Sequence, residues 1–251
     1  MMFVDPTTDR SSSHWRFADV EHGTSGGAAD EFELATLIAL VSAEPAVKGM
    51  WRARQVPFSS PDDHEGRWVY LVEVDGTELT IDPATMSTAL ERSPVEVATT
   101  GGGVSPYQRM IRAYGELVWA ATPEPVLTVA RTFDGVHDDG SPFFAPDHPR
   151  IDDAGERARL LAYLRSAPTI VTTTATARDV AAPERGAVVP LNFRTDGVWI
   201  WPDTIEYYLE QHRYAPDSRL LAHIGEGKDK APPLDGVAIH RATAALFRKE
   251  G

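Results

Sequence analysis

The sequence of 251 residues contains no cysteine, and this absence removes several kinds of chemistry at once. Disulfides, thiolate nucleophiles, and zinc or iron–sulfur sites with cysteine ligands are all excluded. Basic residues are also few, with 24 lysines and arginines against 37 aspartates and glutamates. The resulting net charge of −13 argues against binding to nucleic acid or to an anionic membrane surface, because both need clustered positive charge.

Long apolar runs are missing as well. The longest apolar-rich stretch, LATLIALVSA at 34–43, is about half as long as a helix that crosses a membrane. The first residues, MMFVDPTTDRSSSHWRF, show no basic segment followed by an apolar core, so we expect no secretory signal. These features together lead us to expect a cytoplasmic protein.

Familiar catalytic and nucleotide-binding motifs do not occur either. The sequence has no GxGxxG, no GxxxxGK[ST] and no GxSxG. We therefore expect no cofactor, and the motifs favour no enzyme class.

The segments that are present indicate an α+β fold. Residues 1–30 are rich in Ser, Thr, Gly and Asp and predict a flexible arm. Residues 31–133 and 156–251 each show helical periodicity and hairpins, which predicts two α+β halves. Residues 134–155 are rich in Pro, Gly and Asp, and we interpret them as a linker or a long loop between the halves.

The two halves share an order of elements: a strand, an Asp-Gly pair, a second strand and a helix that begins at proline. The stretches are VEVDGTELTIDPATMSTAL and NFRTDGVWIWPDTIEYYL. Asp-Gly suits a two-residue hairpin turn, which would pair Val72 with Leu79 in the first hairpin. An internal duplication and a convergence on the same local solution both explain the likeness.

The second hairpin places two tryptophans one residue apart. Counted from the turn, Arg194 pairs with Trp199 and Asn192 pairs with Trp201, so these four side chains share one face. Tryptophan beside arginine is typical of binding hot spots, and we predict a partner-binding face made of these four residues. The alternative is that the helix around 205–209 covers the tryptophans.

Histidines and aspartates gather in the segment 134–155. Imidazole and carboxylate are metal ligands, and His137, Asp139 and His148 are the candidates. Their spacing matches no metal motif on a helix or strand, and such loops are usually solvated turns, so we predict no metal site.

The stretch VVPLNFRTDGVWIWPDTIEYYLEQHRYAPDSRLLAHI, in the last third of the chain, resembles uncharacterised actinobacterial proteins. Some of these are similar to the immunity partners of polymorphic toxins. The resemblance implies a protein that neutralises a basic toxin by direct contact, and the acidic charge is consistent with such a partner. The alternatives are an enzyme of unrecognised class, such as a metal-dependent hydrolase with its site between the halves, and a regulatory or scaffold protein.

Overall fold

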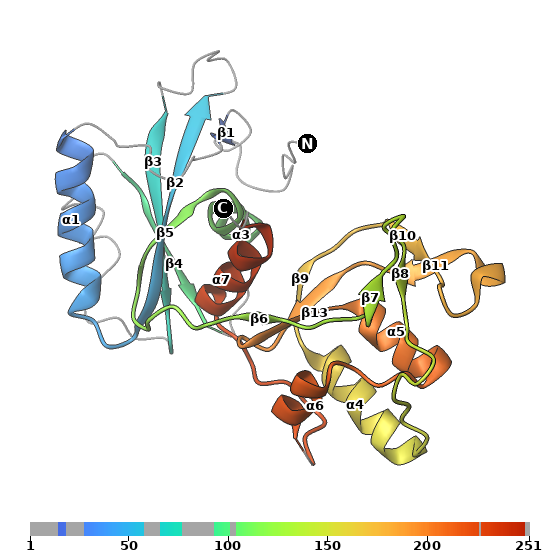
Figure 1. The fold of residues 1–251 in the computed structure, drawn as a ribbon. Coiled ribbons are helices and arrows are strands. Elements are labelled where there is room, and N and C mark those ends of the chain that lie inside the picture. The colour runs from blue at the N-terminus through green and yellow to red at the C-terminus, as the bar shows by residue number, and fades with distance from the viewer. Residues whose placement is uncertain are drawn as a thin grey trace. The chain divides into compact units, whose positions relative to one another are not determined.

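The chain forms two compact units in a computed structural model, which describes residues 15–18, 28–57, 66–76, 93–100, 104–225 and 227–248 (Figure 1). Unit 1 comprises residues 1–123 and 235–240, and unit 2 comprises residues 124–234 and 241–251. Both units combine helices with sheets, so the α+β prediction is confirmed. The segment 134–155, expected to link two halves, lies inside unit 2, and the division falls at residue 123 instead.

Unit 1 is built on a five-stranded sheet. Its strands are β1 (Trp15–Ala18), β2 (Val47–Pro57), β3 (Arg67–Val74), β4 (Val95–Thr99) and β5 (Glu116–Ala120). Strand β2 pairs with β3 along one edge and with β1 and β5 at the two ends of the other edge. All pairs are antiparallel except β3 with β4.

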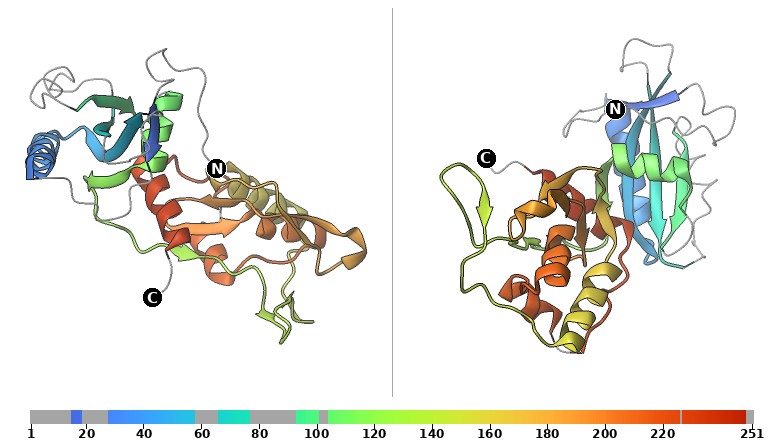
Figure 2. Two further views of the ribbon diagram at one scale, coloured as in Figure 1. Left: turned by 90° about the horizontal axis from the view of Figure 1, so that it is seen from above. Right: turned by 90° about the vertical axis from the view of Figure 1, so that its right-hand side faces the viewer.

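Helices cover both faces of this sheet, which explains why β3 is buried without interruption from Trp68 to Val74. Helix α1 (Ala28–Ser42) packs on one face (Figure 2), and its Leu37 belongs to the same buried apolar cluster as Tyr70 and Val72. Helix α3 (Pro106–Tyr114) packs on the other face and begins with a capping box formed by Ser105 and Gln108. Helix α3 ends at Tyr114, and strand β5 begins two residues later.

The first hairpin differs from its prediction. Residues 77–92, which include the expected second strand and the helix after Pro83, lie outside the described residues. Val72 already has a backbone partner on each side, Met50 of β2 and Val97 of β4. The predicted pairing of Val72 with Leu79 has no free edge on which to form, because β3 is a central strand.

Unit 2 contains a four-stranded sheet in the order β6-β13-β12-β9. The strands are β6 (Thr128–Val129), β9 (Thr169–Val171), β12 (Phe193–Thr195) and β13 (Trp199–Pro202), and the helices are α4 (Ala154–Ser166), α5 (Asp203–His212) and α6 (Ser218–Ile224). Asp153 caps α4, and Asp217 caps α6.

The second hairpin turns one residue later than predicted. Arg194 pairs with Trp201, and Thr195 pairs with Ile200. The Asp196 carboxylate accepts hydrogen bonds from the backbone N–H groups of Val198 and Trp199, which stabilises a turn centred after Gly197. The register shifts by two residues, an even number, so each side chain keeps its predicted face.

Two small hairpins and a terminal helix complete the described chain. They are β7 (Gly135–Val136) with β8 (Pro142–Phe143), β10 (Thr176–Arg178) with β11 (Ala187–Pro190), the short helix η3 (Pro183–Arg185), and α7 (Gly236–Phe247). Within the described ranges, no helix has the length and apolar character needed to cross a membrane.

Candidate functional site

The two tryptophans of the second hairpin belong to the core of unit 2. Trp201 is 0% exposed and Trp199 is 8% exposed. They share one apolar cluster with residues of α4, α5 and α6, among them Leu164, Ile205 and Leu220. The prediction of an exposed indole face is therefore wrong, and the alternative that helices of the same chain cover it is confirmed.

Arg194 and Asn192, predicted to bind a partner beside the tryptophans, instead bond to Asp203 of α5, and Arg194 also joins α5 to the end of α4. The Arg194 Nε donates to Asp203 Oδ1 at 2.7 Å, and its Nη1 donates to the carbonyl oxygens of Arg165 and Ala167 at 3.1 and 2.9 Å. Asn192 Nδ2 donates to the other Asp203 oxygen at 2.9 Å. The negative charge of Asp203 lies at the start of α5, and the positive charge of Arg194 lies at the carbonyl end of α4. Each of these two charges therefore also interacts favourably with a helix dipole.

The three metal candidates do not come together. His148 uses both ring nitrogens, at 2.8 Å from Asp134 Oδ2 and 3.1 Å from the carbonyl oxygen of Ala215. Asp139 accepts hydrogen bonds from the backbone and hydroxyl of Ser141 in its own turn. His137 packs its ring on Phe143, with centroids 4.6 Å apart. Within the described part of the chain, no cluster of His, Asp or Glu has the arrangement of a metal site.

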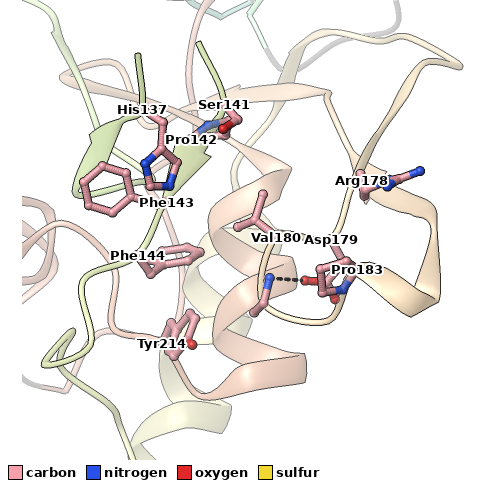
Figure 3. Close-up of a pocket in the computed structure, with 11 residues that line it drawn as sticks. His137, Ser141, Pro142, Phe143, Phe144, Arg178, Asp179, Val180, Pro183 and Tyr214 are labelled. Atoms are coloured by element: carbon pink, nitrogen blue, oxygen red, sulfur yellow. Dashed lines mark hydrogen bonds between the residues drawn. The ribbon is translucent and has the colours of Figure 1, made fainter. Parts of the chain in front are cut away.

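Unit 2 contains an open groove of about 380 Å³ (Figure 3). One wall is a column of rings from the β7–β8 hairpin and the residues after it, together with Tyr214. His137 and Phe143 form the end of this column in Figure 3, and Phe144 lies between them and Tyr214. The opposite wall is the turn between β10 and η3, from which Val180 faces the rings.

Tyr208 of α5 supports both walls. Its hydroxyl accepts a hydrogen bond from the backbone N–H of Val180 at 3.0 Å. Its ring contacts Phe144 edge-on, with centroids 4.7 Å apart, and Phe144 in turn contacts Tyr214 at 4.5 Å. Burial raises the pKa of Tyr208 to about 12, so the phenol keeps its proton at neutral pH. Both walls of the groove are thus fixed to one buried side chain.

Asp179 anchors the wall that carries Val180. One carboxylate oxygen accepts from the Tyr207 hydroxyl at 2.9 Å and lies 2.8 Å from His212 Nε2. The other oxygen accepts from the backbone N–H groups of Ala181 and Ala182. Burial raises the pKa of Asp179, but the hydrogen bonds from His212 and Tyr207 outweigh it, and the pKa lies below its usual value. The carboxylate therefore stays ionised and holds the turn.

Asp134 anchors the ring-lined wall in the same way. Its Oδ2 accepts from the backbone N–H of Ala145 at 2.7 Å and contacts His148 Nδ1. Desolvation raises the pKa of Asp134, yet the hydrogen bonds from Ala145 and His148 bring it below its usual value. The hydroxyl of Ser141, which also lines the groove, donates to Asp139 at 2.6 Å. These polar groups are engaged in holding the walls, so the groove presents mainly rings and apolar side chains to a ligand.

Comparison of the chain with models of known protein families, with curated proteins and with solved structures finds no match. The resemblance of the last third to immunity proteins therefore stays a prediction.

The patterns in the sequence did not predict this groove. Its residues come from a segment interpreted as a linker, from the region of the β10–η3 turn and from the residues after α5. One signal was available: Phe143 and Phe144 stand side by side in a segment of turn residues, and a solvated linker rarely contains two adjacent phenylalanines.

Proposed function

We propose that the chain is a cytoplasmic binding protein that acts by direct contact with another protein, as an immunity factor that neutralises a basic toxin. The observation that carries the proposal is the groove of unit 2, whose rings are exposed or partly exposed while Tyr208 and Asp179, which support its walls, are buried. Large aromatic side chains in a preformed concave surface are typical of protein recognition. The resemblance of the last third points to the same class.

The rigidity of the groove supports recognition. Tyr208 joins the two walls, and Asp179 and Asp134 each hold one wall through several short hydrogen bonds. A preformed surface loses little conformational entropy when a partner binds. The groove is therefore ready to bind without rearrangement of its walls.

The charge of unit 1 supports a basic partner. Unit 1 holds 19 acidic residues against 9 basic ones, whereas unit 2 holds 18 against 15. An excess of negative charge attracts a basic protein over long distances and accelerates its capture. Unit 1 thus accounts for most of the net charge, and unit 2 supplies the ring-lined groove.

Site-specific photo-cross-linking in the native host tests this function. A photoreactive phenylalanine analogue is placed at His137, in the groove, and as a control at Phe32, an aromatic residue of unit 1 that is 77% exposed. We expect one protein to be captured at position 137 and not at position 32. That protein, once purified, binds the full chain, and its toxicity in cells is suppressed when the chain is co-expressed. A captured protein that is harmless in cells would refute the immunity function.

A further inference from the structure

The lining of the groove indicates the shape of its occupant. The rings of His137, Phe144 and Tyr214 follow one another along one wall, and Val180 faces them across the gap (Figure 3). Pro183 also lines the groove. A row of rings opposite an aliphatic wall accepts a narrow, extended chain, because successive side chains of such a chain can each rest on a ring.

Free hydrogen-bonding groups on the ring wall point to an extended chain with unsatisfied carbonyl groups. Neither the Tyr214 hydroxyl nor the His137 imidazole has a hydrogen-bond partner among the described residues, and His137 is exposed. A polyproline II segment has no internal hydrogen bonds, so its carbonyl oxygens are available to such donors. Its conformation is also preformed, which lowers the entropic cost of binding.

Charge around the groove is unequal. The turn of the β7–β8 hairpin carries Asp138 and Asp139, both exposed. Hydrogen bonds from Ser141 lower the pKa of Asp139, so its charge is present at neutral pH. Arg178 lines the opposite wall. The hairpin side therefore favours a cation, and the side of Arg178 does not.

We infer that the groove binds an extended, proline-containing segment of the partner protein, with a basic residue of that segment beside Asp138 and Asp139. The inference rests on the proposed function and names the part of the partner that enters the groove. The prolines lie against the rings, Tyr214 donates to a carbonyl oxygen of the segment, and the basic residue fixes the direction of the chain.

Calorimetric titration of the full chain with synthetic peptides of about ten residues, roughly three turns of polyproline II, tests the occupant. The first peptide is polyproline with one central arginine. The second has glutamate in place of the arginine, and the third has glycine and serine in place of the prolines. We expect the first to bind most tightly, the second more weakly and the third not measurably. Equal affinities for the three peptides would overturn the inference.

Single substitutions locate the bound peptide. Tyr214→Phe keeps the ring and removes one neutral hydrogen bond, so the affinity for the first peptide falls about fivefold. Asp138→Asn weakens an exposed ion pair, and the affinity falls about twofold to fivefold at low salt. Matched controls are Phe32→Leu in unit 1 and Asp152→Asn in unit 2, both exposed and outside the groove, and we expect no change in affinity. Unchanged affinity in the groove variants would place the peptide elsewhere and refute the inference.

The outcomes separate the occupant from the function. If the protein captured at position 137 binds but the arginine-polyproline peptide does not displace it, the groove does not bind a proline-containing segment, and the proposed function stands. If the peptide binds in the groove and the captured protein proves harmless, the inference that the groove binds a proline-containing segment is supported, and the immunity function fails. If the protein captured at position 137 is instead a second copy of the chain, the inference fails.

Discussion

Replacing Arg194 with alanine should destabilise unit 2 strongly. The side chain is 21% exposed and its partner Asp203 is 9% exposed, so the ion pair is largely shielded from water. The substitution removes one charge-assisted bond to Asp203 and two hydrogen bonds to carbonyl groups at the end of α4. Loss of one partner of a buried ion pair costs about 3–5 kcal/mol. Because Asn192 still donates to Asp203, we expect a loss of about 3 kcal/mol, at the low end.

Urea unfolding followed by tryptophan fluorescence measures this loss, and hydrogen exchange shows whether it is confined to unit 2. Arg194→Lys keeps a charge but loses the forked geometry, so it should recover only part of the stability. In a double-mutant cycle with Asp203→Asn, the two substitutions should couple, because each removes the same ion pair. If Arg194→Ala is as stable as the wild type, Arg194 does not hold α4 and α5 together, and it becomes a candidate for partner binding again.

Three further predictions follow from other buried groups. In the folded protein the pKa of Asp179 lies below its usual 3.8. The contribution of Asp179 to stability is therefore complete above about pH 4 and is lost as the pH falls through the folded pKa. Asp179→Asn should reduce this loss of stability at acidic pH, as measured by urea unfolding over a range of pH. Gly236→Ala places a methyl group against Glu73 and the guanidinium of Arg112, and a thermal melt should show a marked loss of stability in unit 1. Trp201→Ala opens a cavity in a fully buried cluster, so urea unfolding should show a loss of about 3–5 kcal/mol, whereas unchanged stability would mean that the indole is exposed.

Local patterns in the sequence were sufficient for several elements. The helix α1 follows from apolar spacing and acidic residues in its first turn, and α4 follows from its cap at Asp153. The strand β4 follows from its β-branched residues. In the second hairpin, the alternation of side chains assigned Arg194 and Trp201 to one face, and that assignment survives the shift in register. These features depend on neighbours along the chain, which the sequence displays directly.

The tertiary structure decided that the tryptophan face of that hairpin is buried as well as the face of Ile200. Alternation separates two faces, but whether Trp201 meets water depends on how α4, α5 and α6 pack against it, and α4 lies far from the hairpin in the sequence. Asp179 becomes an anchor only because folding brings it to His212, 33 residues away. The groove likewise forms only because Val180 and Phe144, which lie far apart in the sequence, both contact Tyr208. Periodicity carries no information about such long-range neighbours, because their approach is set by how all the apolar faces are buried together.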